Sequence, residues 1–133
     1  MSNEQQIEQE IQTKGLNAPR INPQQVDSVI LSEHYFTAEQ GVRSAYHDNN
    51  DVHIGSTINA KAAEGLPCIT FCVLILNNGF KIVGVNCASV SPENFDAQLG
   101  RKLAYEDARK KIWELEGYLL KEKLYQAELD RQF

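Results

Sequence analysis

The sequence has no uninterrupted apolar run that is long enough to cross a membrane. Its longest apolar stretch, residues 66–76, is broken by Pro67 and Thr70 and is much shorter than the roughly 20 residues that a transmembrane helix needs. The N-terminal segment is rich in glutamine and acidic residues, so it lacks the basic start and apolar centre of a secretory signal. We therefore expect no membrane as a partner and a protein that stays in the cytoplasm.

The chain also lacks an excess of positive charge. It has 13 lysines and arginines against 18 aspartates and glutamates, which gives a formal net charge of −5. Non-specific affinity for nucleic acid depends on basic side chains that displace counterions from phosphates. Nucleic acid is therefore not an expected partner, and any site for an anion must be local.

Catalytic and nucleotide-binding motifs are missing as well. The sequence contains no Gly-x-Ser-x-Gly elbow, no P-loop and no Rossmann glycine fingerprint. His47 and His53 stand in a polar stretch without the Cys-x-x-Cys or His-x-x-x-His spacing of a metal site, so we expect solvated loop residues there. His34 is expected to make a hydrogen bond at a helix end. These observations predict a protein that is not an enzyme and that uses no metal and no cofactor.

Cysteine is scarce: three residues, Cys68, Cys72 and Cys87, lie in apolar stretches typical of strands. An odd number of cysteines in a reducing compartment indicates thiols rather than disulfides. Because free cysteine is among the most buried residue types, we expect buried thiols at these positions.

What the sequence does contain fits a single α+β domain. The chain has 133 residues, of which 42% are hydrophobic, and this is enough for one core. We expect the domain to span residues 21–128, between a flexible N-terminal tail (1–20) and a C-terminal tail (129–133). Since Ile7 and Ile11 are spaced by four, a short helix that docks on a partner subunit is the alternative for the N-terminal segment.

The first predicted element is a short N-terminal helix over about residues 23–33. Asn22 is a suitable cap, Pro23 favours the first helical position, and Gln25 completes a capping box. Residues 41–65 lose hydrophobic periodicity and are rich in turn-forming residues. We expect a long loop there.

An antiparallel β-hairpin is the central predicted element. Apolar runs at 68–76 and 80–90 flank Asn78-Gly79, the dipeptide that favours a two-residue type I′ turn. Such a turn gives the register Asn77 with Phe80, Ile75 with Ile82, Val73 with Gly84 and Phe71 with Asn86. Both faces of this hairpin are apolar, and one helix can cover only one of them. We therefore expect either more strand, from the 50s, or a second subunit.

A long C-terminal helix is predicted from about residue 92 to 128, with Ser91 as its cap and Pro92 at its first position. Its apolar residues fall into two stripes, one for the hairpin and one for something else. The stripes are Phe95, Leu99, Leu103, Trp113, Leu120 and Leu124, and Tyr105, Ala108, Ile112, Leu115 and Leu119. We assign Tyr105, Ile112, Leu115 and Leu119 to the interface of a homo-oligomer, a dimer or larger.

Basic residues on the same helix are candidates for a ligand site. Lys102 and Arg109 lie within about 20° of each other around the helix and Arg101 is close to them, which predicts one cationic ridge. The planar fork of arginine suits phosphate, and Phe95 and Trp113 are available for stacking. The predicted ligand-binding residues are therefore Arg101, Lys102, Arg109, Phe95 and Trp113. The alternative is a solvated face, in which Glu106 pairs with Lys110 and Asp107 with Lys111.

Several ordered blocks of the sequence resemble a known family. They are residues 32–36, 66–74, 78–80, 91–96, 100–102, 108–113 and 115–120. Over roughly residues 22–121 the chain resembles the phage protein family typified by gene product 49 and gene 66 of two short-tailed phages. The resemblance implies a phage or prophage accessory protein and carries no activity over to this chain.

These observations lead to one hypothesis and one alternative. The hypothesis is a non-enzymatic phage accessory protein of the host cytoplasm that counters host defence by capturing a small anionic, nucleotide-like signal. The alternative is a protein–protein interaction module that binds a host or phage protein through the C-terminal helix. Only a family-level analogy, that small phage accessory proteins often counter host defence, supports the counter-defence role.

Overall fold

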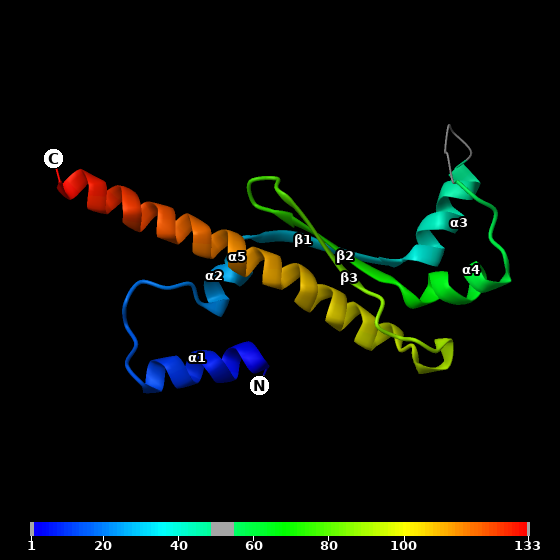
Figure 1. Cartoon of the computed structure of the whole chain (residues 1–133), viewed down its shortest axis with the longest axis horizontal. Coiled ribbons are helices and arrows are strands. Elements are labelled where there is room, and N and C mark those ends of the chain that lie inside the picture. Colours follow the sequence, from blue (N-terminus) through cyan, green and yellow to red (C-terminus); the bar gives the residue numbers. More distant parts are fainter. Residues whose placement is uncertain (1, 49–54, 133) are drawn as a thin grey trace.

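A computed structural model describes residues 2–48 and 55–132. The elements are α1 (Asn3–Thr13), α2 (Pro23–Ser28), β1 (Ile30–Thr37), α3 (Ala38–Asp48), α4 (Ala60–Gly65), η1 (Leu66–Cys68), β2 (Thr70–Leu76), β3 (Lys81–Asn86), η2 (Pro92–Asn94) and α5 (Ala97–Arg131). The strands form one antiparallel sheet in the order β1-β2-β3, and α5 packs on β2 and β3 (Figure 1). This arrangement confirms the predicted α+β class, with the hairpin inside a larger sheet and a long C-terminal helix.

The third strand is not where the sequence analysis placed it. The cap at Asn22 is as predicted, since its side chain accepts a 2.8 Å hydrogen bond from the backbone of Gln25. However, α2 ends at Ser28, and residues 30–33, the end of the predicted helix, belong instead to β1 (Ile30–Thr37). This segment is rich in Ile, Tyr, Phe and Thr, which favour strands, and pairing with β2 outweighs the local helix signal. No strand forms at residues 55–59, and residues 51–54 lie outside the described part of the chain.

The hairpin is present, but its predicted register is wrong by one residue. The backbone N–H of Gly79 donates to the carbonyl of Leu76 over 2.8 Å, and Gly79 has a φ of +85°. The connection is therefore the three-residue type that ends in a left-handed glycine, not a two-residue type I′ turn. Asn77 is held within the turn because its side chain donates to the carbonyl of Ser28 over 2.7 Å.

The correct register places the smallest residue of β3 under the long helix. Cys72 pairs with Gly84 and Leu74 pairs with Ile82. A Cβ atom on Gly84 would lie 2.2 Å from the carbonyl oxygen of Ala104, so only glycine permits this approach. The predicted pairing of Val73 with Gly84 would have placed this glycine across from a residue on the other face of β2.

The core lies between α5 and one face of the sheet. Its buried members are Val26, Cys72, Leu74, Leu76, Ile82, Ala104, Ala108 and Ile112. On α5 the inner stripe is therefore Ala104, Ala108 and Ile112, so Ile112 belongs to the core and not to a surface between chains. The sequence analysis assigned Ile112 and Tyr105 to an oligomer interface because it could not tell which stripe faced the hairpin.

The N-terminal segment that was expected as a flexible tail contains helix α1. Ser2 and Gln5 form a capping box at its start. Glu8 accepts hydrogen bonds of 2.5 and 2.7 Å from Arg20, and this guanidinium lowers the pKa of the Glu8 carboxyl. Glu4 pairs with Arg109 of α5 at 2.5 Å, so α1 docks on its own chain.

Two further boundaries differ from the prediction. Residues 41–65 were expected to form one long loop, but α3 continues to Asp48 and α4 occupies residues 60–65. The C-terminal tail expected at 129–133 is helical as far as Arg131. Residues 60–64, Ala-Lys-Ala-Ala-Glu, are strong helix formers and outweigh the surrounding turn-forming residues. The expectation for His53 lies outside the described residues.

Side chains of α5 cover the outer edge of β3. Asp107 accepts a 2.9 Å hydrogen bond from the backbone N–H of Val85, and Lys111 donates to the carbonyl of Val83. The sequence analysis paired Asp107 with Lys111 as a surface ion pair. Here both saturate the free edge of a strand, which blocks that edge from pairing with another chain.

The face of the sheet that α5 does not cover carries apolar side chains. Phe36 stacks on Phe71 with 5.2 Å between ring centroids, and Val83 and Val85 of β3 are exposed. The prediction that one helix covers only one face is therefore confirmed. None of the described helices combines the length and the hydropathy that spanning a membrane would require.

Candidate functional site

A small pocket lies where the start of α5 meets the ends of β1 and β2. It has a volume of about 190 Å³ and is lined by Tyr35, Phe36, Thr37, Gln40, Thr70, Phe95, Ala97 and Arg101. We call it the Arg101 pocket. Arg101 and Phe95 were predicted as ligand-binding residues, and the structure brings them into one pocket.

Arg101 is the charged residue of this pocket. Its side chain is exposed, and within residues 2–48 and 55–132 no acid lies at ion-pair distance from it. Ala97, the first residue of α5, also lines the pocket, so the positive end of a 35-residue helix is directed at the same space. Asp96 caps that helix and accepts a 2.8 Å hydrogen bond from the backbone N–H of Leu99. This N–H group is therefore not available to a ligand.

Thr70 supplies a buried hydroxyl in the same pocket. The residue is 2% exposed, and its Oγ1 has no hydrogen-bond partner within the described part of the chain. A buried polar group without a partner costs about 1–3 kcal/mol. Thr70 and Arg101 line the same pocket, so an anion bound there would lie beside both side chains.

Gly100 shapes the pocket from the helix side. A Cβ atom there would lie 2.8 Å from Oγ1 of Thr70 and 3.0 Å from the ring of Phe95. The absence of a side chain lets the Phe95 ring and the Thr70 side chain pack directly against α5. Phe95 is held in place by this contact.

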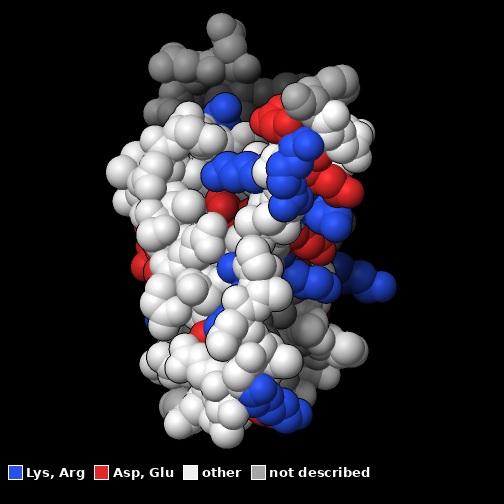
Figure 2. All heavy atoms as spheres, turned by 90° about the vertical axis from the view of Figure 1, so that its left-hand side faces the viewer, with Lys and Arg blue, Asp and Glu red and all other residues white. Residues whose placement is uncertain are grey.

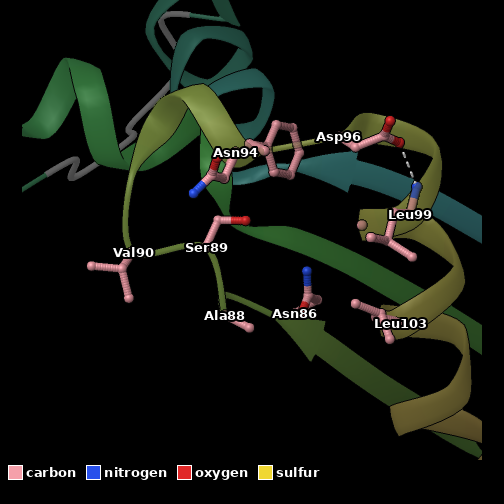
Figure 3. Close-up of a pocket in the computed structure, with 10 residues that line it drawn as sticks. Asn86, Ala88, Ser89, Val90, Asn94, Asp96, Leu99 and Leu103 are labelled. Atoms are coloured by element: carbon pink, nitrogen blue, oxygen red, sulfur yellow. Dashed lines mark hydrogen bonds between the residues drawn. The ribbon is translucent and has the colours of Figure 1, made fainter.

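A second, larger pocket lies on the other side of Phe95. Its volume is about 380 Å³. Figure 3 shows Asn86, Ala88, Ser89, Val90 and Asn94 on one side and Leu99 and Leu103 of α5 on the other. Phe95 lines both pockets. The larger pocket has amide and hydroxyl groups at its mouth and apolar side chains from the helix.

Arg109 has a different role from Arg101. Its guanidinium donates to Glu4 over 2.5 Å and to Asp27 over 2.6 Å, and it also donates to the carbonyl of Pro23 and the hydroxyl of Tyr105, each over 3.1 Å. Burial by itself lowers the pKa of Arg109, but Glu4 and Asp27 outweigh this effect and raise the pKa above its ordinary value. Arg109 joins α1, α2 and α5, and these bonds occupy its donors.

The predicted cationic ridge is therefore not formed. Lys102 is exposed outside the Arg101 pocket, and Trp113 packs against the core far along α5. Of the predicted interface residues, Tyr105 and Ile112 face the chain itself, whereas Leu115 and Leu119 are exposed.

The titratable groups near the pocket are shifted towards their neutral forms. Burial raises the pKa of Tyr35, with further contributions from Cys72 and Glu33, so its phenol remains a hydrogen-bond donor. Burial also raises the pKa of the Cys72 thiol, which makes it a poor nucleophile.

Cys68 is buried as predicted, but Cys87 is exposed. It follows the last residue of β3, where the sheet no longer covers it. Within the described residues, no three His, Cys, Asp or Glu side chains are placed to hold a metal ion.

The sequence analysis missed Thr70 and Gln40. Thr70 stands inside an apolar strand and carries no motif, so nothing in the sequence shows that its hydroxyl is left unpaired. Gln40 forms a reciprocal capping box with Thr37 at the start of α3. The Thr37–Gln40 capping pattern is local, but its position beside α5 depends on the fold.

The geometry defines a small α+β domain with a pocket at one end of its sheet. A family model described as Phage protein (N4 Gp49/phage Sf6 gene 66) family matches residues 21–124. The chain belongs to this phage protein family, as the sequence blocks suggested. Nothing among curated proteins and nothing among solved structures matches it.

Proposed function

We propose that this phage protein is a non-enzymatic accessory protein of the host cytoplasm that binds a small anionic molecule in the Arg101 pocket. The observation that carries the proposal is that one pocket is lined by an exposed arginine, Arg101, and by Thr70 with its buried hydroxyl, neither of which has a polar side-chain partner among residues 2–48 and 55–132. Both groups can donate a hydrogen bond to an oxyanion. Hydrogen bonds in which one partner is charged are about twice as strong as neutral ones.

The size of the pockets limits the ligand. A space of about 190 Å³ admits a phosphate or carboxylate head group but is small for a whole drug-sized molecule. The larger pocket beyond Phe95 offers room and an aromatic ring for the remainder of the ligand. A mononucleotide combines such a head group with a flat ring, and the capture of a nucleotide signal would serve a counter-defence role.

Calorimetric titration with adenosine monophosphate, and with adenosine as the uncharged control, tests the proposal. Arg101→Ala should weaken binding of the monophosphate at least about tenfold, because a charge-assisted hydrogen bond contributes about 1.5–3 kcal/mol. Arg101→Lys should recover only part of this loss, since lysine keeps the charge but not the planar fork.

Two further variants separate binding from folding. Thr70→Val removes the hydroxyl without a change of volume, so binding should weaken while thermal stability is kept or increased. Lys102→Ala is the matched control, because it removes a neighbouring exposed charge outside the pocket. Equal binding by wild type and Arg101→Ala, or no binding to any anion of a nucleotide panel, contradicts the proposal.

A second candidate function is binding to a host or phage protein through α5. Leu115, Tyr118 and Leu119 are exposed on the part of the helix that extends past the sheet. In a pull-down from host lysate, Leu119→Asp should then abolish capture of the partner, whereas Arg101→Ala should leave it intact.

A further inference from the structure

The second half of α5 projects beyond the sheet. The helix has 35 residues, which corresponds to about 50 Å at 1.5 Å per residue, whereas β2 has seven residues and spans about 23 Å. Ile112 is the last buried residue of the helix. Figure 1 shows the C-terminal end of α5 extending past the hairpin. We call residues 113–131 the projecting half.

A regular apolar seam runs along the projecting half. It consists of Trp113, Gly117, Leu120, Leu124 and Ala127, at alternating steps of four and three residues. This is the spacing of the contact positions in a coiled coil. Trp113, the first residue of the seam, packs against the core. The middle of the seam is rotated by about 100° around the helix from Ile112, so beyond Trp113 it lies on another side of the helix from the buried stripe. Leu124 in the seam is 39% exposed.

The charges beside the seam are complementary between two parallel copies. In a parallel coiled coil, a residue that flanks one side of the seam meets the residue five positions later on the other chain. Glu116 then meets Lys121 of the second copy, and Lys123 meets Glu128 of the second copy. Both contacts join opposite charges.

An antiparallel pair with the same overlap has the opposite property. In that arrangement, residues on the same flank of the two seams face each other. Lys121 then lies opposite Lys121 of the second copy, and Glu114 lies opposite Glu128 of the second copy, so like charges meet. Figure 2 looks at the end of the molecule from which α5 projects and shows basic and acidic side chains interspersed there. Such a mixed surface suits a partner with the same mixed pattern, which a second copy supplies.

We infer that the projecting half is a self-association site at which a second copy of this chain pairs with it as a parallel, in-register coiled coil. The Arg101 pocket lies at the other end of α5, so the dimer holds two such pockets away from the seam. The inference is independent of the ligand, because its residues and those of the pocket are different.

Sedimentation equilibrium at tens of micromolar tests self-association. The wild type should have twice the chain mass of 15.0 kDa. Leu124→Asp should weaken dimerisation at least tenfold, and Leu119→Asp, on another side of the helix, is the matched control that should leave it unchanged. Circular dichroism should show that both variants keep their fold, because neither residue is part of the core. A monomeric wild type, or equal dissociation by the two variants, overturns the inference.

Cross-linking tests the parallel register. In a Cys87→Ser background, which removes the exposed native thiol, Ala127→Cys should form a disulfide-linked dimer under mild oxidation because residue 127 meets itself across a parallel seam. Gln126→Cys, which points away from the seam, is the control and should stay monomeric on a non-reducing gel. A dimer that cross-links through neither position, or only through Gln126→Cys, refutes the parallel arrangement.

Charge exchange gives a third measurement. Lys121→Glu should weaken the dimer because it places two glutamates together, and the double variant Glu116→Lys with Lys121→Glu should restore it. Failure of the second change to rescue the first contradicts the proposed charge pairs.

Discussion

The two halves of α5 belong to one continuous helix but differ in their surroundings. Residues 97–112 include all five buried residues of the helix, Gly100, Ala104, Ala108, Arg109 and Ile112. Residues 113–131 contain leucines and tyrosines that are mostly exposed. Side-chain size accounts for the difference: glycine and alanine in the first half let the helix approach Gly84 of β3, whereas the larger side chains of the second half have no sheet opposite them.

The two arginines of the first half extend this comparison. Arg101 and Arg109 are both on α5, yet Arg109 is 7% exposed and fully engaged, whereas Arg101 is exposed at a pocket. The difference arises from α1 and α2, which bring Glu4 and Asp27 to Arg109. Residue type alone therefore does not separate a structural arginine from one that is available to a ligand.

The largest expected effect is at the contact between the sheet and the packed half of α5. In Gly84→Ala the new Cβ would lie 2.2 Å from the backbone oxygen of Ala104 and 2.5 Å from the backbone nitrogen of Ala108. Backbone atoms cannot move aside without separating the helix from the sheet, so we expect a loss of at least about 3 kcal/mol in the free energy of unfolding. Urea denaturation measures this. Gly65→Ala is the control, because nothing lies within 4 Å of its Cβ position.

The next effect compares one apolar residue from each half. Ile112 is completely buried and Leu119 is 51% exposed. Ile112→Ala should cost about 2–5 kcal/mol through lost burial and a cavity, and Leu119→Ala less than about 0.5 kcal/mol. The same denaturation series gives both values. A large loss at Leu119 would show that something covers the projecting half at that position.

A smaller effect is expected at the arginines. Arg109→Met removes the contacts with Glu4, Asp27 and the carbonyl of Pro23, and we expect a loss of about 1–3 kcal/mol, because the acids left behind are partly solvated. Arg101→Met should change stability by less than about 0.5 kcal/mol. If the two variants melt at the same temperature, Arg109 does not hold the helices together.

The sequence predicted those features that depend on local signals. The cap at Asn22, the hairpin around Gly79 and the long C-terminal helix each follow from residues close together in the chain. The N-terminal helix was only the alternative to a flexible tail, and its docking on its own chain was not predicted, because the partner of Glu4, Arg109, lies 105 residues away. Likewise, residues 30–33 of β1 were predicted as the end of a helix, because the pairing of β1 with β2 joins segments that are distant in sequence.

The candidate site was predictable only in part, for the same reason. Arg101 and Phe95 were found because they stand on one helix with suitable chemistry. Thr70 was not, because its role depends on an unpaired hydroxyl that only packing reveals. Of the stripe assigned to an oligomer interface, Tyr105 and Ile112 meet the chain's own core, since helical periodicity gives the angle between two faces but not which of them meets the sheet.

The smallest expected effect differs in sign between the two halves of α5. Both halves contain one glycine, and replacing glycine by alanine within a helix favours folding by up to about 1 kcal/mol when the new methyl group meets nothing. At Gly117 nothing lies within 4 Å of the Cβ position, so Gly117→Ala should raise the free energy of unfolding by about this amount. At Gly100 the Cβ would lie 2.8 Å from Oγ1 of Thr70 and 3.0 Å from the ring of Phe95. The local gain is then offset by displacement of these side chains, so Gly100→Ala should destabilise the protein and disturb the Arg101 pocket. Urea denaturation of both variants, with titration of adenosine monophosphate into each, decides the matter. If both variants change the free energy of unfolding in the same direction, the packed and projecting halves do not differ at Gly100 and Gly117 in the way that the structure indicates.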